Sequence, residues 1–285
     1  MTGIDKIGVI GLGAMGAGIA QLAVEAGYET VGREVTAELG DRAAARIGHF
    51  LTRKVEKGLL GQADRDAAVA RLSVTTELSG LQDCDLVIEA IVEELAPKQQ
   101  LFAELDRIVG DHAVLATNTS ALSVTEIASA TGRPERVVGM HFFNPAPLMP
   151  LVEIVRAELS GDAAVDAAAG VGERMGKKVV RCHDTPGFVV NRILIPLLND
   201  CVKVLDEARV TPEALDTAMQ NGAGWPMGPC TLVDLVGIDV HVHASEALYE
   251  KVREPRMAPP PRLVAMKNAG LLGRKSGRGF YRYDA

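Results

Sequence analysis

Two residues, His141 and Glu153, have side chains that could together move a proton. His141 follows the apolar run RVVGM at 136–140, and Glu153 is the single carboxylate in the apolar run LVEIV at 151–155. As a lone residue, His141 would more often be structural, and a carboxylate among apolar side chains is costly to bury unless it is paired. Pairing the two removes that cost and leaves an imidazole suited to general acid/base catalysis.

A second polar segment has a similar place in the chain. Asn118-Thr119-Ser120 follows the apolar run AVLAT at 113–117, as His141 follows RVVGM. Both runs are expected strands, and open α/β sheets bind their ligands at the carboxyl ends of parallel strands. We therefore expect a ligand to bind beside these two segments.

The N-terminal segment contains a glycine pattern that is typical of dinucleotide sites. An expected strand leads into GLGAMG at 11–16, and a helix-compatible run follows. Gly11 permits a tight turn, Gly13 lets the backbone approach a pyrophosphate, and Gly16 lets helix and strand pack closely. The N–H groups at the start of the helix would bind the phosphates. This context favours a dinucleotide over a plain glycine-rich turn.

Glu34 follows the second expected strand, ETVGR at 29–33, about 20 residues after the glycines. A carboxylate there accepts hydrogen bonds from the adenosine ribose and repels a 2′-phosphate, which favours NAD over NADP. Arg33 leaves NADP open, because its guanidinium could meet a 2′-phosphate, although a lone arginine is more often a solvated surface charge.

Strand-like runs alternate with helical patterns over the first two-thirds of the chain. This alternation predicts an α/β fold, a Rossmann-type doubly wound and mostly parallel sheet. The expected strands include 6–10, 85–89, 113–117, 136–140 and 152–155, and 97–109 is an expected helix. The alternation stops at DTPG, 184–187, and long helical patterns follow it, among them 188–207 and a helix capped by Thr211. We predict an NAD-binding domain at 1–184 and a smaller all-helical domain at 185–285.

Charge and composition argue against several classes of protein. There are 30 Lys and Arg residues against 37 Asp and Glu, a net charge of −7, which disfavours binding to nucleic acid. The sequence has no secretory signal and no apolar run of about 18 residues, so we expect no membrane association. The four cysteines are far apart and contain no C-x-x-C pair, which predicts reduced thiols, no metal site and a cytoplasmic location.

Six blocks of sequence carry a resemblance to a known family. They are NTSALS, HFFNPAP, LVEIV, DTPGFVVNRI, GWPMGPCTLVDLVGID and GRKSGRGFYRY, in this order. With them the chain resembles the 3-hydroxyacyl-CoA dehydrogenases over nearly its whole length, and most of all the single-function bacterial 3-hydroxybutyryl-CoA dehydrogenases. The resemblance implies NAD-dependent oxidation of short-chain L-3-hydroxyacyl-CoA to 3-ketoacyl-CoA, and the reverse reaction.

The resemblance also implies roles for individual residues. His141 would remove the C3 hydroxyl proton while hydride leaves C3 for the nicotinamide, and Glu153 would orient the imidazole. Ser120 and Asn191 would hydrogen-bond substrate oxygens, although Asn191 alone would be interpreted as a helix-end residue. Further cofactor contacts are implied for Glu93, Lys98, Ser120, Asn144 and Lys275.

Two positions depart from the family pattern, and a basic group between the cofactor strands suggests a further contact. The family usually has an aspartate at Glu34 and a bulkier residue at Gly32, so NADP stays open. Arg53, Lys54 and Lys57 in FLTRKVEKG form a compact basic group. Our hypothesis is that this group binds the phosphates of CoA, and the alternative is a solvated helix face.

Other interpretations keep the fold and change the function. The same histidine and glutamate could act on a hydroxyacyl group carried by acyl carrier protein, or on another hydroxy acid. A 6-phosphogluconate-like dehydrogenase would need a catalytic lysine that the helix after Gly187 lacks. A non-catalytic dinucleotide-binding module is the non-enzyme alternative.

A homodimer formed through the helical domain is predicted by the apolar surface on 188–207 and 227–249. The resemblance also implies it, because members of the family are commonly dimers through this domain.

Overall fold

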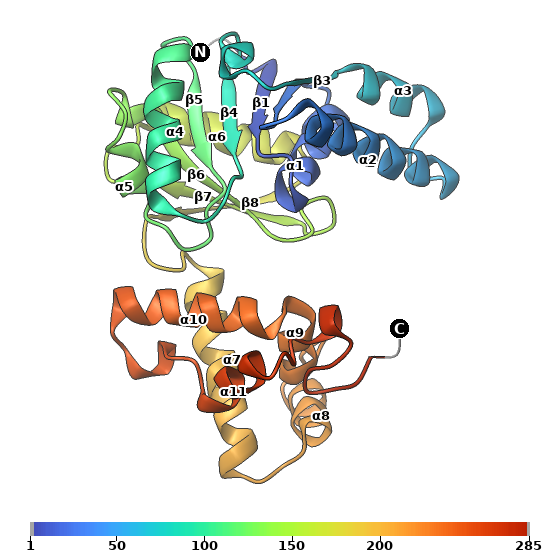
Figure 1. Ribbon diagram of the computed structural model, residues 1–285, viewed down its shortest axis with the longest axis vertical. Coiled ribbons are helices and arrows are strands. Elements are labelled where there is room, and N and C mark those ends of the chain that lie inside the picture. Colours follow the sequence, from blue (N-terminus) through green and yellow to red (C-terminus); the bar gives the residue numbers. More distant parts are fainter. Residues whose placement is uncertain (1–2, 284–285) are drawn as a thin grey trace. The chain divides into compact units, whose positions relative to one another are not determined.

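The computed structural model describes residues 3–283 (Figure 1). Contacts along the chain divide it after Thr185 into two compact units. The first unit contains an eight-stranded sheet with strand order β3-β2-β1-β4-β5-β6-β7-β8. The strands are β1 (Lys6–Ile10), β2 (Glu29–Arg33), β3 (Leu72–Thr75), β4 (Leu86–Glu89), β5 (Val114–Thr117), β6 (Val137–Phe142), β7 (Leu151–Arg156) and β8 (Lys178–His183).

Neighbouring strands run parallel except for β6 and β7, which are antiparallel. The predicted mostly parallel, doubly wound sheet is therefore confirmed. The central strands β4, β5 and β6 are buried along their whole length, which is why they are continuous apolar runs in the sequence. The sequence analysis did not predict β3 and β8. These are the two edge strands, and their partly exposed residues give no such apolar signal.

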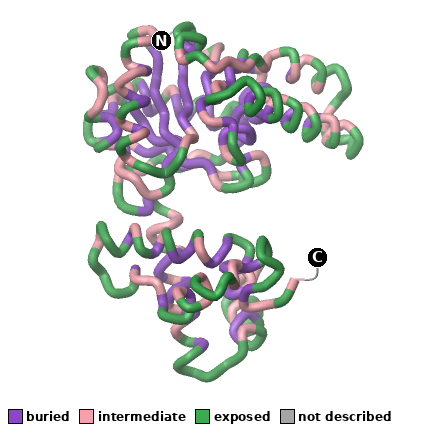
Figure 2. The backbone as a smooth tube through the Cα atoms, in the orientation of Figure 1, coloured by how far each residue is buried: buried purple, intermediate pink, exposed green. Residues whose placement is uncertain are grey.

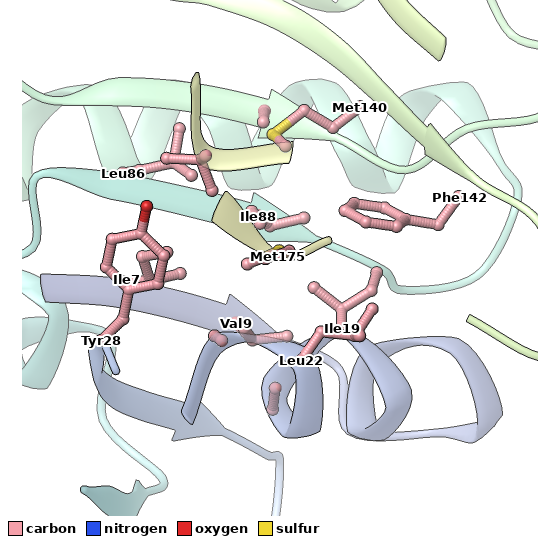
Figure 3. Close-up of a cluster of buried hydrophobic side chains, with 14 of the residues drawn as sticks. Ile7, Val9, Ile19, Leu22, Tyr28, Leu86, Ile88, Met140, Phe142 and Met175 are labelled. Atoms are coloured by element: carbon pink, nitrogen blue, oxygen red, sulfur yellow. The ribbon is translucent and has the colours of Figure 1, made fainter. Parts of the chain in front are cut away.

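Helices cover the two faces of this sheet, and in Figure 1 α4 and α6 lie on opposite faces. The helices of the first unit are α1 (Ala14–Glu25), α2 (Ala37–Glu56), α3 (Gln62–Ala70), α4 (Leu95–Ile108), α5 (Val124–Ala128) and α6 (Asp162–Arg174). Side chains of α1 and α6 join those of the central strands in one apolar cluster (Figure 3). Its members include Ile19 of α1, Ile88 of β4 and Phe142 of β6, all buried. This core fixes the strand ends that carry the predicted site.

The second unit consists, within 186–283, of helices, turns and isolated bridges. Its helices are α7 (Val190–Glu207), α8 (Pro212–Gly222), α9 (Pro229–Val236), α10 (Ile238–Val252) and α11 (Pro261–Asn268). The Thr211 hydroxyl accepts a hydrogen bond from the backbone N–H of Ala214, as its place before Pro212 predicted. Helix α7 begins two residues later than predicted, since Gly187 and Phe188 have positive φ angles. Figure 2 shows that buried residues lie inside each unit separately.

Two buried carboxylates hold the C-terminal segment, residues 280–283, against the helices of the second unit. Asp234 accepts hydrogen bonds from the backbone N–H groups of Phe280 and Tyr281 and from the Tyr283 hydroxyl, at 2.9–3.0 Å. Asp216 accepts from the Tyr281 hydroxyl at 2.8 Å and from the backbone N–H of Cys230 at the start of α9. Because a buried carboxylate needs such donors, these two aspartates fix the glycine-rich segment near the C-terminus.

A buried histidine makes the second unit sensitive to acid. His241 Nε2 lies 2.8 Å from Asn199 Oδ1, and burial lowers the pKa of His241 to about 4. The folded state therefore keeps His241 neutral, whereas the unfolded state takes up a proton below about pH 6.5. The stability that His241 contributes is present above pH 6.5 and is lost as the pH falls towards 4.

We expect the free energy of unfolding of the second unit to fall by up to about 3 kcal/mol between pH 7 and pH 4 because of His241. Denaturant titrations followed by fluorescence of Trp225, the single tryptophan, report on this unit. The variant His241→Gln keeps a side-chain donor for Asn199 and does not titrate, so its stability should depend less on pH. Equal pH dependence in the two proteins would contradict the prediction.

Candidate active site

The antiparallel pairing of β6 with β7 brings the two predicted proton-transfer residues together. His141 and Glu153 are direct cross-strand partners, and His141 Nδ1 lies 2.8 Å from Glu153 Oε2. His141 is 3% exposed and Glu153 is fully buried. The ring of Phe143 lies against the imidazole, with a centroid distance of 4.5 Å. The carboxylate thus holds the imidazole by one nitrogen and fixes its orientation, which is what a general base requires.

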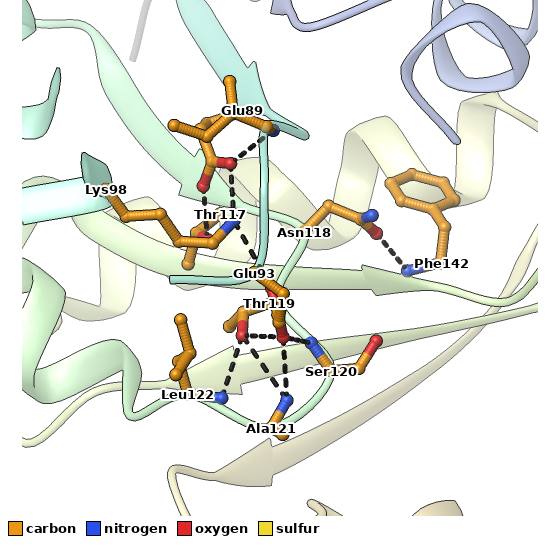
Figure 4. Close-up of polar contacts among 11 residues, drawn as sticks. Glu89, Glu93, Lys98, Thr117, Asn118, Thr119, Ser120, Ala121, Leu122 and Phe142 are labelled. Atoms are coloured by element: carbon orange, nitrogen blue, oxygen red, sulfur yellow. Dashed lines mark hydrogen bonds and ion pairs between the residues drawn. The ribbon is translucent and has the colours of Figure 1, made fainter. Parts of the chain in front are cut away.

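The loop after β5 lies beside the end of β6. Asn118 Oδ1 accepts a hydrogen bond of 2.9 Å from the backbone N–H of Phe142, the residue after His141 (Figure 4). Two residues further on, Ser120 is exposed. The structure therefore brings the Ser120 loop and His141 to neighbouring strand ends of one sheet edge, as the sequence predicted. Asn118 itself, as the residue that connects these strand ends, was missed.

Glu93 fixes the backbone of this loop. Its Oε1 accepts hydrogen bonds from the Thr119 hydroxyl at 2.6 Å, the Ser120 N–H at 2.7 Å and the Ala121 N–H at 3.1 Å (Figure 4). Lys98, on the first turn of α4, is fully buried and pairs with Glu93 and with the buried Glu89. Without the family resemblance Lys98 would have been interpreted as a solvated charge, and its burial shows that this interpretation is wrong. Glu89 was missed, although it ends an apolar run, DLVIE, much as Glu153 interrupts one.

The glycine turn between β1 and α1 has the geometry that a dinucleotide needs. Gly11 has φ +82°, and a Cβ on Gly16 would lie 1.8 Å from the Gly11 carbonyl oxygen, so both positions require glycine. A Cβ on Gly13 would meet nothing within 4 Å, which leaves the space in front of the first turn of α1 open for a phosphate group. The residues of this turn therefore fit a bound dinucleotide.

Glu34 and Arg33 lie beside this turn, at the end of β2. Glu34 Oε1 accepts a hydrogen bond of 2.6 Å from the Leu12 N–H, so the carboxylate stands next to the glycine turn. Arg33 Nε donates to the Thr76 carbonyl oxygen at 3.1 Å, which ties the guanidinium to the segment after β3. This arrangement places a carboxylate at the turn, and it matches the sequence argument that favoured NAD over NADP.

A cavity of about 550 Å³ lies among α1, α2 and the segment that contains Asn144. Its lining combines apolar side chains such as Phe50 with the predicted basic group, Arg53, Lys54 and Lys57. Lys54 is engaged by Glu25 in an ion pair of 2.5 Å, whereas Arg53 and Lys57 are exposed. The structure thus brings the basic group and Asn144 to one cavity.

Arg46, also at this cavity, was missed. Its Nη2 donates to the carbonyl oxygens of Leu12 and Gly13, at 2.8 and 3.0 Å. Its spacing of four residues from Phe50 and seven from Arg53 places it on their face of α2, and that spacing could have revealed it.

Two further predicted site residues belong to the second unit. Asn191 is the second residue of α7 and is half-buried, and Lys275 forms an ion pair of 2.6 Å with Asp239. Their roles at the active site stay predictions.

Among residues 3–283 no helix is long and apolar enough to cross a membrane. The described part of the chain also contains no group of three or more potential metal ligands.

Comparisons with known proteins cover both units of the chain. Residues 6–185 match the NAD binding domain of 3-hydroxyacyl-CoA dehydrogenase, and residues 187–283 match the C-terminal domain of the same family. A 3-hydroxybutyryl-CoA dehydrogenase of Mycobacterium tuberculosis is 44% identical over 282 residues, 98% of this chain and 99% of the relative. A probable 3-hydroxybutyryl-CoA dehydrogenase of Deinococcus radiodurans is 44% identical over 278 residues, 98% of this chain and 100% of the relative.

A solved structure extends the likeness to three dimensions. The (S)-3-hydroxybutyryl-CoA dehydrogenase of Ralstonia eutropha matches with a TM-score of 0.95 and 37% identity, covering 99% of this chain and 100% of that one. The chain belongs to the 3-hydroxyacyl-CoA dehydrogenase family, which confirms the resemblance in its motifs. It is an NAD-dependent oxidoreductase that acts on 3-hydroxyacyl-CoA.

The pairing of His141 with Glu153 predicts the effect of removing the carboxylate charge. Glu153→Gln keeps the size of the side chain but stabilises a protonated imidazole less, so we expect kcat to fall about 100-fold. The rate is measured with acetoacetyl-CoA and NADH at 340 nm. Glu158→Gln, an exposed glutamate just after β7, is the matched control. Equal kcat values for the two variants would show that the pair has no catalytic role.

Proposed function

We propose that the protein interconverts short-chain L-3-hydroxyacyl-CoA, such as 3-hydroxybutyryl-CoA, and the corresponding 3-ketoacyl-CoA, with His141 and Glu153 as its acid/base pair. The observation that carries this proposal is the buried 2.8 Å contact between the two side chains, at the same sheet edge as the Ser120 loop and the glycine turn. The short acyl chain is supported by the names of the relatives, which are 3-hydroxybutyryl-CoA dehydrogenases over nearly the full length of this chain.

In the oxidative direction the imidazole of His141 takes the proton of the C3 hydroxyl group. Bound NAD would supply the hydride acceptor for C3, so that the alcohol would lose one proton and one hydride and become a ketone. Glu153 stabilises the imidazolium that forms, because its carboxylate lies 2.8 Å from Nδ1. Ser120 and Asn191 hydrogen-bond the substrate oxygens. In the reductive direction the protonated His141 returns its proton to the C3 oxygen.

The direct test is the oxidation of NADH or NADPH at 340 nm with acetoacetyl-CoA. We expect turnover with NADH, and we expect His141→Ala to lower kcat by at least about 100-fold because the acid/base group is lost. His49→Ala, an exposed histidine on α2, is the control and should keep full activity. Binding of NADH without turnover of acetoacetyl-CoA would contradict the proposal, and would favour a hydroxyacyl group on another carrier.

We also propose that the cavity beside α2 receives the phosphate groups of CoA. Arg53 and Lys57 are exposed at this cavity and are positioned to pair with phosphates, whereas Lys54 already pairs with Glu25. The adjoining apolar side chains, such as Phe50, offer a surface for the uncharged parts of CoA. Lys54 then has a structural part in this group, since it joins α2 to α1 through Glu25.

Charge reversal at this cavity has a specific expected result. Arg53→Glu and Lys57→Glu should each raise the KM for acetoacetyl-CoA about tenfold, because each replaces an attraction to phosphate by a repulsion. The KM for the N-acetylcysteamine thioester of acetoacetate, which has no phosphate, should not change. Lys178→Glu, on the edge strand β8, is the control for a general loss of positive charge. Unchanged KM values for acetoacetyl-CoA would refute the assignment.

The two domains have separate tasks in this proposal. Residues 1–184 bind NAD, and residues 185–285 contact the substrate and form a homodimer. Support for self-association comes from exposed apolar side chains of the second unit, among them Ile193, Leu235 and Val240, which are 62%, 47% and 50% exposed. A monomeric mass by analytical ultracentrifugation at micromolar concentration would rule out the dimer. The cytoplasmic location expected from the sequence stays a prediction.

A further inference from the structure

A completely buried ion pair lies behind the loop that carries Ser120. The side chains of Glu89, at the end of β4, and Lys98, on α4, are both 0% exposed, and Lys98 Nζ lies 2.5 Å from Glu89 Oε1. Removing two charges from water is costly, and such a pair gives no clear gain in stability over apolar side chains of the same size.

Glu89 is held by the ends of two neighbouring strands. Its Oε2 accepts a hydrogen bond of 2.7 Å from the hydroxyl of Thr117, its partner in the register of β4 and β5, and its Oε1 accepts one of 2.7 Å from the Ile91 N–H. With Lys98 as a third donor, the carboxylate has a fixed place at the carboxyl ends of β4 and β5. That is where the Ser120 loop begins.

Lys98 connects this fixed carboxylate to a partly exposed one, that of Glu93. Its Nζ lies 3.5 Å from Glu93 Oε2, and the Glu93 side chain is 33% exposed on the segment between β4 and α4. The ammonium attracts Glu93, and without it the partly exposed carboxylate would be free to turn towards solvent. With it, Glu93 Oε1 stays where it accepts hydrogen bonds from the N–H groups of Ser120 and Ala121 (Figure 4).

The other side of the loop is tied to the acid/base pair. Asn118 accepts the hydrogen bond from the N–H of Phe142, the neighbour of His141. The loop is therefore held at Asn118 by β6 and at Ser120 by Glu93. Loss of one attachment would shift the Ser120 hydroxyl relative to the imidazole, and misplacement of a reacting group by about 1 Å can lower a rate about 100-fold.

We propose that Glu89 and Lys98 are positioning residues, which act through Glu93 to hold the Ser120 loop in its reactive place. In this arrangement Lys98 affects the reaction without touching cofactor or substrate, in contrast to the direct cofactor contact that the family resemblance implies. The inference rests on the proposed function only for the role of Ser120.

The test uses the full-length protein and a double variant, Glu89→Gln with Lys98→Met. Lys98→Met alone would leave a buried carboxylate unpaired and could unfold the protein, whereas the double variant replaces both charges by neutral side chains of similar size. In the double variant Glu93 lacks its ammonium. We expect kcat to fall ten- to hundredfold. Lys178→Met is the control for loss of a lysine, on the exposed edge of the sheet.

Two further readouts separate positioning from a merely structural role. Ser120 and Ala121 N–H groups bonded to a carboxylate have downfield amide proton shifts, and these should move upfield in the double variant in NMR spectra without substrate. Adding Ser120→Ala to the double variant should lower kcat little beyond the effect of Ser120→Ala alone, because the double variant and Ser120→Ala both act through the Ser120 hydroxyl.

Two results would overturn the inference. The first is that the amide shifts and the kcat of the double variant match those of the Lys178→Met control. The second is weakened NADH binding with unchanged amide shifts, which would mean that Lys98 contacts the cofactor itself. Because the amide shifts are recorded without substrate, a wild-type protein inactive on acyl-CoA would overturn the proposed function without touching the contact chain from Lys98 to Ser120.

Discussion

The antiparallel pairing of β6 with β7 is the constraint on which the candidate site depends. If the sheet stayed parallel after β6, the next strand would begin at the edge where β6 begins. A crossover helix would then have to connect the two strands. Reversal of direction places Glu153, near the start of β7, opposite His141, near the end of β6. The two side chains then lie on one face of the sheet at the distance of a hydrogen bond. A carboxylate that would be unfavourable alone in this apolar strand is thereby paired with the imidazole.

Buried carboxylates connect neighbouring elements at several places in the molecule. Glu153 joins β7 to β6, Glu89 joins β4 to β5, and Asp216 and Asp234 join the C-terminal segment to the second unit. In each case the oxygens accept from backbone N–H groups or side-chain donors of a different element. A hydrophobic contact tolerates sliding, whereas these hydrogen bonds fix direction and distance, so carboxylates stand where loops or chain ends need a defined position.

The sequence predicted those features that local pattern determines. Apolar runs revealed the central strands, the glycine spacing revealed the turn before α1, and the isolated Glu153 revealed its need for a partner. Edge strands such as β8 were missed because their side chains are partly exposed. The break between α9 and α10 was missed because it depends on one residue, Gly237, with φ +102°.

The burial of Lys98 depends on where α4 packs, and spacing along the chain does not encode that. Glu89, by contrast, could have been found. It ends an apolar strand as a lone carboxylate, which is the same kind of signal that identified Glu153.

Gly32 and Glu34, at the end of β2, are linked through one residue, Leu12. A Cβ on Gly32 would lie 2.7 Å from Leu12 Cδ1, so the absence of a side chain at 32 lets Leu12 pack into the core. The backbone of Leu12 is held on both sides, because its N–H donates to Glu34 and its carbonyl oxygen accepts from Arg46. Glu34 Oε1 reaches this N–H directly, at 2.6 Å. Residues 12, 32 and 34 therefore form one packing unit, and a larger residue at 32 would displace Leu12 from the position in which it meets Glu34.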